Sequence, residues 1–506
     1  MAFESNSFNV AKKYKLPEKE FTVDCNIPVE SEVAKIFTVS AGVFVKTKEV
    51  LNGNINYAGE IETCVIYMAE DGEVNSTHHS CPFSAKFEDE NILESQNVII
   101  RVRVLNYTIK NVDNGTIAIA FELEQAGVVT FNQEVRSIAI SDESINTREE
   151  DMMVVRIGEQ TQSTIITNGV LNVREPIKKL LLCESQVEIK EITPGINFVT
   201  VIGEVVSRVL YLTENDRFES SYVFDNFKEE IEIESVTRDS QVEANGFICF
   251  NEVKAEVENT ESGAKVELTV PVEIYLTSYE EENVKVISDL YSTENETFVV
   301  TESFDMTSAL PIETVDGKVD GTLVIEDDKP RVDKILFTGG NFVNVTNIEH
   351  GDGTITVTGI ARTNVVYLND ETNSIQSVEL EVPFVLNNRT SFSDDADINA
   401  YVVISDVDVV VKKGRELFYD AKIKVVITAN KQKIMAVITN ANIAERLPEK
   451  DYALEVIFGK SGQNSWEIAK QNKIKEEILT RQNPDVIFPL LQDTQLVIYY
   501  QNLLKK

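Results

Sequence analysis

One pattern occurs three times along the chain, and it constrains the fold more than any other feature. In each copy a glycine lies eight residues before a tyrosine, inside a run of β-branched and aromatic residues. The three pairs are Gly59 and Tyr67, Gly203 and Tyr211, and Gly359 and Tyr367. The glycines are 144 and then 156 residues apart, which is the length of a typical domain. The pattern therefore predicts three related domains in this 506-residue chain.

Further landmarks keep the same register. Fifteen or sixteen residues after each tyrosine comes a two-residue motif that ends in phenylalanine. These motifs are Pro82-Phe83, Asn226-Phe227 and Pro383-Phe384, and a closing pair recurs at Ser141-Asp142 and Ser288-Asp289. A glycine inside a strand indicates a bulge or a close approach of the backbone, and tyrosine and phenylalanine supply apolar bulk. We therefore interpret the landmark residues as structural core and turn positions.

The chain before Leu447 has the pattern of β-strands. Short runs rich in Val, Ile, Thr, Phe and Tyr are separated by Asn, Asp, Gly and Glu. In the run 98–107, for example, Arg101 and Arg103 share one face of the expected strand. Turn signals such as Asn114-Gly115 are typical of hairpins. We predict a mainly β fold made of three antiparallel, sandwich-like repeats.

The segment after Pro448 has a different pattern, which predicts a strand, two short helices and a strand. Asn464 and Glu467 have the spacing of a helix N-cap pair, and Asn483-Pro484 ends the second helix. The chain's single tryptophan, Trp466, lies in the first helix. The predicted units are β repeats at 1–150, 151–302 and 303–448 and a small βααβ module at 449–506.

Charge separates this module from the repeats. The chain has 47 basic and 84 acidic residues, a formal net charge of −37. A field of this sign repels phosphates, so we exclude nucleic acids and anionic membrane surfaces as partners. From 453 to 506 the basic and acidic residues number seven and six, so the negative excess belongs to the repeats. No stretch approaches the ~18 apolar residues that span a bilayer, and the first thirty residues have no apolar signal-peptide core.

Reactive and metal-binding residue types are sparse. The five cysteines are an odd number without a CxxC pair, which favours a reducing, cytoplasmic compartment over a disulfide framework. His78, His79 and Cys81 cluster as HHSC, but in only one repeat and without a fourth ligand. No phosphate-binding loop, nucleophile elbow or dinucleotide fingerprint occurs. We predict a non-enzymatic protein with no catalytic residues, no metal and no cofactor.

The C-terminal segment resembles the LysM family. The matching segments are 455–458 for the first strand, 466–469 for the first helix, Asn483-Pro484 after the second helix and 495–498 for the last strand. In LysM modules two loops form a groove for N-acetylglucosamine chains. The resemblance implies a partner-binding or glycan-binding groove at Ser461, Gly462, Gln463, Asn464, Trp466, Ile468, Asn483, Pro484 and Asp485. The turn reads Gly-Gln-Asn where the family has Gly-Asp-Thr, and Asp493 replaces a late glycine.

The repeats resemble the SPOCS domain of sporulation proteins, whose closing motif is similar to the Ser-Asp-Leu-Tyr-Ser run that starts at Ser288. SPOCS repeats followed by one LysM module are similar to the SipL family of clostridial coat-morphogenesis proteins. The resemblance implies a scaffold in the mother-cell cytoplasm, at the forespore surface. It would anchor the coat basement layer by binding the coat ATPase, stage IV sporulation protein A, through the LysM-like module.

Other interpretations stay open at this point. The module could bind peptidoglycan of the cell wall or the spore cortex, or target a wall hydrolase, although no catalytic constellation accompanies it. Trp466 could be a core residue under the first helix, or an aromatic anchor at a partner interface.

Overall fold

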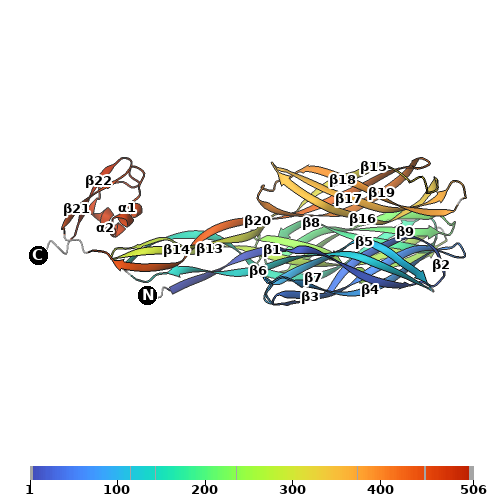
Figure 1. The fold of residues 1–506 in the computed structure, drawn as a ribbon, viewed down its shortest axis with the longest axis horizontal. Helices are drawn as coiled ribbons and strands as arrows, with labels where there is room; N and C mark the ends of the chain where they lie inside the picture. The colour runs from blue at the N-terminus through green and yellow to red at the C-terminus, as the bar shows by residue number, and fades with distance from the viewer. Residues whose placement is uncertain are drawn as a thin grey trace.

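The computed structural model describes residues 4–113, 115–142, 144–234, 236–261, 263–372, 374–448 and 452–500. Within these residues the strands form seven antiparallel sheets, and two short α-helices lie near the C-terminus. The prediction of a mainly β, antiparallel fold is confirmed. The sheets make a broad body, long strands continue from it as a narrow stalk, and the C-terminal module lies at the far end of the stalk (Figure 1).

Strands β1 to β6, which we call the first repeat, form two three-stranded sheets packed face to face. One sheet has the order β1-β6-β5 and the other β2-β3-β4. The strands are β1 (Glu4–Pro28), β2 (Val33–Leu51), β3 (Asn54–Ala69), β4 (Val74–Glu88), β5 (Asn97–Asp113) and β6 (Thr116–Ala139). Alternate apolar residues of both sheets, among them Ile27, Ile61 and Phe121, meet in one buried core. Each sheet thus buries one face, as in a sandwich.

The second repeat, β7 to β13, and the third, β14 to β20, repeat this plan. The second contains β7 (Ile145–Val173), β8 (Ile177–Pro194), β9 (Phe198–Thr213), β10 (Phe218–Glu232), β11 (Gln241–Ile248), β12 (Lys254–Thr260) and β13 (Gly263–Ser292), with a short 3-10 turn at Phe250–Glu252. The third contains β14 (Asn295–Ala309), β15 (Glu313–Val324), β16 (Val332–Gly351), β17 (Thr354–Asn369), β18 (Ile375–Arg389), β19 (Ala396–Lys413) and β20 (Glu416–Arg446). In each, one sheet is a three-stranded meander and the other contains a long closing strand, β13 or β20.

The landmark glycine and phenylalanine are cross-strand partners in all three meanders. The pairs are Gly59 with Phe83, Gly203 with Phe227, and Gly359 with Phe384. The first strand of each meander has a β-bulge immediately after the residue opposite the glycine. An added Cβ at Gly203 would lie 2.3 Å from the Phe227 ring and 2.5 Å from the carbonyl oxygen of Glu188. Only glycine leaves room for both the ring and the bulged backbone.

The other landmarks also occupy structural positions. Tyr67, Tyr211 and Tyr367 are buried. The Tyr367 hydroxyl donates to the Pro330 carbonyl at 3.1 Å, and the Tyr67 hydroxyl lies 3.2 Å from Ser31 Oγ. Pro82 and Pro383 lie exposed on the edge strands β4 and β18, where a missing N–H removes no inner ladder bond.

We predict that Gly203→Ala lowers the free energy of unfolding by about 2–3 kcal/mol, because overpacking forces the Phe227 ring or the bulged strand to move. Gly351→Ala is the matched control, since a Cβ there meets nothing within 4 Å. Thermal or urea unfolding of both variants measures the difference. Equal stability of the two variants would show that the glycine register has no packing role.

The three repeats close into a ring through their meander sheets. Cys64, Arg208 and Asn364 lie at equivalent positions of the central strands, separated by the same 144 and 156 residues as the glycines. Each contacts the first meander strand of the next repeat. The contacts run from Cys64 Sγ to the Leu181 carbonyl at 3.3 Å, from Arg208 Nη2 to the Thr338 carbonyl at 2.7 Å, and from Asn364 Nδ2 to Thr38 Oγ1 at 3.3 Å. These contacts run from the first repeat to the second, from the second to the third and from the third back to the first, so they form a closed cycle.

Apolar side chains pack where the three meander sheets meet and along the inside of the stalk. Phe37, Leu181 and Phe337, again at equivalent positions, meet in one buried cluster. In the stalk the pairs β1/β6, β7/β13 and β14/β20 pack around a second cluster that includes Val155, Val286 and Val437. The repeats are therefore arranged side by side about an axis, and each contributes one strand pair to the stalk (Figure 1).

Cys25 on β1 and Cys81 on β4 form a disulfide between the two sheets of the first repeat, with 5.9 Å between their Cα atoms. The expectation that the cysteines are unpaired was wrong for these two residues. They are 56 residues apart in the sequence, and only the packing of one sheet on the other brings them together. Cys64, Cys183 and Cys249 are free thiols.

Candidate functional site in the C-terminal module

The C-terminal module has the order strand, helix, helix, strand. It consists of β21 (Leu454–Gly459), α1 (Ser465–Gln471), α2 (Glu476–Gln482) and β22 (Thr494–Tyr499), and its two strands pair antiparallel. Asn464 Oδ1 accepts from the Glu467 N–H at 2.9 Å and Glu467 accepts from the Asn464 N–H at 3.0 Å. The predicted N-cap pair of the first helix is thereby confirmed as a capping box.

The two loops that would form a glycan groove are hydrogen-bonded to each other. The Ser461 N–H donates to Asp493 at 2.9 Å, and the Gly462 N–H donates to the Leu490 carbonyl at 2.7 Å. The Leu490 N–H in turn donates to the Gln463 carbonyl at 2.9 Å. Asp493, which stands in place of the late glycine of the LysM pattern, is one of these acceptors. The departures from the family pattern therefore coincide with a direct contact between the loops.

The remaining predicted groove residues divide into structural and exposed positions. Ile468 is buried in the module core. The Asn483 side chain accepts from the Val497 N–H at 2.9 Å and donates to the Val497 carbonyl at 3.0 Å, so it joins the end of α2 to β22. Pro484 and Asp485 are exposed beyond the helix. The structure brings Ser461, Gly462 and Gln463 together at the loop contact, and the others lie elsewhere in the module.

Trp466 packs against the tip of the stalk. Its indole N–H donates to Asp289 Oδ2 at 2.8 Å, and its ring meets Tyr291 edge-on with 5.0 Å between centroids. Lys470 forms an ion pair with the same Asp289 at 2.5 Å, and the Tyr291 hydroxyl donates to the Ile474 carbonyl at 2.8 Å. Trp466 is 7% exposed, which fits its interpretation as a buried residue. The face of the indole that could anchor a partner already contacts the stalk of the same chain.

The electrostatics of this contact favour an ionised Asp289. Burial by itself raises the pKa of the carboxyl group, but hydrogen bonds from Lys470 and Trp466 outweigh it and hold the pKa below its usual value. The contact between stalk and module is thus built on a charged acceptor that serves two donors.

Sequence reasoning missed the role of the closing motif of the second repeat. Asp289 and Tyr291 belong to the Ser-Asp-Leu-Tyr-Ser run and form the surface on which the module lies. A signal was present, because the first copy of the motif has Ser144 where the second has Tyr291. A large aromatic residue in only one copy indicates a contact that only one copy makes.

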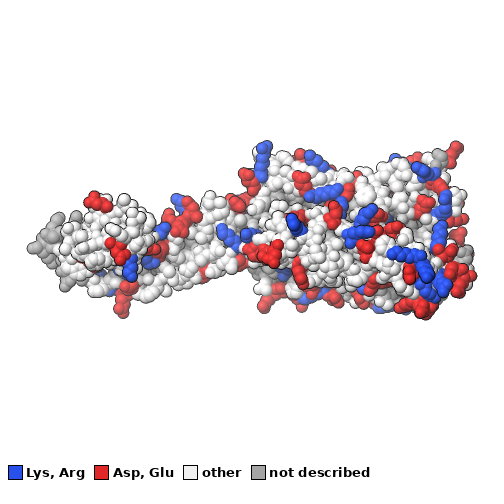
Figure 2. All heavy atoms as spheres, turned by 90° about the horizontal axis from the view of Figure 1, so that it is seen from above, with Lys and Arg blue, Asp and Glu red and all other residues white. Residues whose placement is uncertain are grey.

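An apolar surface of the module points away from this contact. Leu454, Val456 and Phe458 alternate along the outer face of β21, and Tyr499 is the cross-strand partner of Leu454. Phe458 is 78% exposed, and Leu491, in the loop before β22, is 84% exposed. In the view of Figure 2 the described part of the C-terminal module shows mostly uncharged atoms, whereas the body carries many acidic and basic side chains. We call Leu454, Val456, Phe458 and Tyr499 the outer sheet face.

The metal interpretation of HHSC has no support from the geometry. Cys81 is bonded to Cys25, and His78 Nε2 instead lies 3.7 Å from Cys64 Sγ, where burial lowers the pKa of the imidazole. Among the described residues no group of three His, Cys, Asp or Glu side chains could hold a metal ion. In the same part of the chain no helix is long and apolar enough to cross a membrane.

Comparison with known proteins gives one family match. Residues 32–112 match the family described as SipL, SPOCS domain. This segment spans the meander β2 to β4 and nearly all of β5, and it contains Gly59, Tyr67 and Phe83. The match supports a SipL-like relationship and a role related to the spore coat. No curated protein and no solved structure matches the chain.

Proposed function

We propose that the protein is a non-enzymatic scaffold of endospore coat assembly. It anchors the coat basement layer at the forespore by binding the coat ATPase, stage IV sporulation protein A, through its C-terminal module. The match of residues 32–112 to the SipL SPOCS domain supports the process, and the exposed outer sheet face supports the binding mode.

The outer sheet face is the observation that carries this proposal. Large apolar side chains that cluster on an exposed surface mark protein interaction sites in soluble proteins. Here Val456 is 40% and Phe458 78% exposed although neither is needed for the module core, which lies on the other face of β21. The stalk holds the module at its tip with this face turned outward, so a partner can reach it.

The contact between the two loops argues for a protein partner over a glycan. A sugar chain bound as in LysM modules would lie between these two loops, which are joined directly by the hydrogen bonds of Ser461 to Asp493 and of Gly462 to Leu490. A protein that docks on the outer sheet face leaves these hydrogen bonds intact. Peptidoglycan binding is therefore the competing outcome of the test.

The test is a Val456→Ser/Phe458→Ser variant of the full chain, with binding to the purified ATPase measured by biolayer interferometry. We expect the affinity to fall by about tenfold or more, because removing two exposed apolar anchors loses their burial in the complex. Ile434→Ser is the matched control: Ile434 is 76% exposed but lies on the stalk strand β20. Co-sedimentation of the wild type with peptidoglycan, together with unchanged ATPase affinity of the double variant, would overturn the proposal in favour of glycan binding.

A further inference from the structure

A large cavity lies where the three repeats meet, away from the C-terminal module. Its volume is about 1140 Å³, and residues of all three repeats line it. Strands β2, β5, β8, β11, β16 and β19 contribute lining residues, together with β1, β6, β13 and β17. The cavity therefore sits on the axis of the ring, and a chain of separate domains would not form it.

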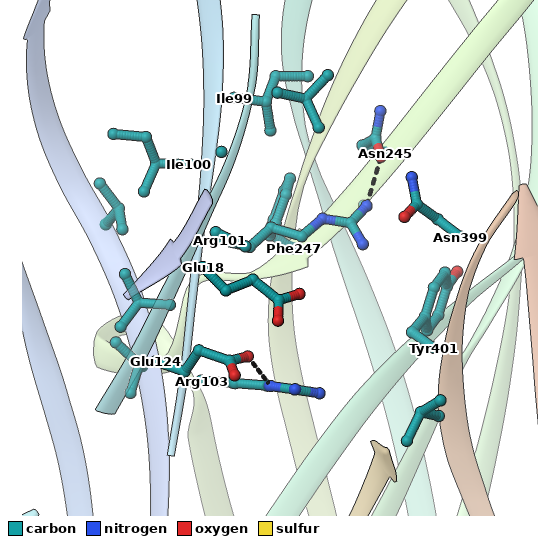
Figure 3. A pocket seen from close by; sticks show the side chains of 18 of the residues that line it. Glu18, Ile99, Ile100, Arg101, Arg103, Glu124, Asn245, Phe247, Asn399 and Tyr401 are labelled. Carbon is teal, nitrogen blue, oxygen red and sulfur yellow. Dashed lines mark hydrogen bonds and ion pairs between the residues drawn. The ribbon is translucent and has the colours of Figure 1, made fainter. Parts of the chain in front are cut away.

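A positive charge that forms no ion pair among the described residues faces this cavity, and the carboxylate of Glu243, which pairs with Lys13, favours its charged form. Arg101 of β5 donates to Asn245 of β11, and its guanidinium lies 5.4 Å from the Phe247 ring centroid and 5.8 Å from that of Tyr401 on β19. Figure 3 shows Arg101 pointing toward Asn245, Asn399 and Tyr401 across the cavity. Among the described residues no carboxylate lies within ion-pair distance of Arg101, although Arg103 and Lys13 nearby have such partners.

Burial makes this arrangement costly for the cation. Loss of hydration lowers the pKa of Arg101, but a guanidinium stays protonated near neutral pH. Lys48, which also lines the cavity, lies 5.2 Å from the Tyr275 ring centroid and donates to the Val98 carbonyl, and the Glu273 carboxylate favours its charged form. A bound carboxylate would give Arg101 a direct ion pair, and the flanking aromatic rings would cover an apolar neighbour of that carboxylate.

Three of the strands that line the cavity are also edge strands, and the side chains of Lys48, Arg362 and Lys15 donate to carbonyls on two of them. Strands β5, β11 and β19 lie at the edges of their sheets, and in the described part of the chain each is laddered to one neighbour only. An edge strand accepts an extended peptide by continuing the sheet. The volume also exceeds the range of about 300–1,000 Å³ that is usual for small-molecule sites.

We propose that this cavity binds an extended peptide segment of a partner protein and that the segment places an acidic side chain on Arg101. The backbone of the segment pairs with an exposed strand edge, and its apolar residues contact Phe247 and Tyr401. The site is distinct from the outer sheet face, so the two can be tested separately.

In the experiment, a display library of random linear peptides is selected for binding to the full chain. One enriched peptide is then synthesised, and its affinity is measured by fluorescence polarisation. We expect enriched peptides to contain acidic residues, and Arg101→Gln to weaken binding of the synthetic peptide by about tenfold or more, the loss of one charge-assisted contact. Arg136→Gln is the matched control, because Arg136 is exposed on β6 and pairs only with Glu134. If Arg101→Gln unfolds, Lys48→Gln replaces it, since Lys48 lines the cavity and is exposed.

Several outcomes would overturn the proposal. The selection could enrich no peptide, or enrich peptides that lack acidic residues. The wild type and both cavity variants could also bind the synthetic peptide with equal affinity. Finally, succinate could bind saturably without being displaced by the enriched peptide. The last result would assign the cavity to a small dicarboxylate.

Discussion

Deletion of residues 295–446, the third repeat, should unfold or aggregate the body while the C-terminal module stays folded. The closed cycle of contacts loses the Arg208 to Thr338 and the Asn364 to Thr38 links, and the buried cluster around Phe37 and Leu181 becomes exposed. We expect the thermal transition of the remaining body to fall by about 10 °C or more, and dye binding to exposed apolar surface to rise. Differential scanning calorimetry and a hydrophobic dye measure both effects.

The deletion keeps the module next to the end of β13, although it removes the ion pair of Lys473 with Glu296. The Leu447 N–H donates to the Glu294 carbonyl at 2.8 Å, so these two residues are already adjacent and one short glycine linker joins them. The module core of Ile468, Leu479 and Leu496 receives no side chain from the third repeat, and it should give its own transition. A deletion product whose two remaining repeats are as stable as before would show that the repeats are independent domains and that the ring closure contributes little.

Asp289→Ala should release the C-terminal module from the stalk. The substitution removes the acceptor of both Trp466 and Lys470, and two hydrogen bonds to a charged group contribute about 3 kcal/mol together. Since Trp466 is the only tryptophan in the chain, its fluorescence reports the contact directly. We expect the emission maximum to move to longer wavelength as the indole becomes hydrated.

The same contact should depend on pH in a definite direction. The pKa of Asp289 is lowered when the module is docked, so docking is stabilised above the ordinary aspartate pKa of about 3.9 and is lost as the pH falls through the docked pKa. Acidification below about pH 4 should therefore shift the emission of the wild type and leave Asp289→Ala unchanged.

Asp142→Ala supplies the control for both measurements. Asp142 is the equivalent residue of the first closing motif, and it bonds the backbone of Ser144 without any contact to the module. An unchanged spectrum of Asp289→Ala at neutral pH, or the same shift in Asp142→Ala, would contradict the docking role of Asp289.

The local features of the fold follow from local chemistry, and the sequence predicted them well. β-branched runs between turn residues indicated antiparallel strands, and the Asn464 and Glu467 pair indicated the start of α1. The predicted repeat boundaries stay predictions: β7 and β14 begin a few residues before the positions 151 and 303 that we assigned.

The candidate site was less predictable because its parts are distant in the sequence. The resemblance to LysM modules implied a groove at Ser461, Asn483 and Asp485, but it contained no information that the loops form hydrogen bonds with each other. The exposed residues Val456 and Phe458 were assigned only to the first strand of the module, because alternation shows two faces but not which of them the helices cover.

The strand content, the threefold register of the landmark glycines and the distinct C-terminal module could be predicted without the structure, because these depend on residue types at short, regular spacings. Only the tertiary structure decided that the repeats close into a ring, that Cys25 meets Cys81, that Trp466 lies against Asp289, and that Arg101 faces a shared cavity. Each of these contacts joins residues from separate sheets or repeats. Such pairings are set by how whole sheets pack, and no local pattern encodes them.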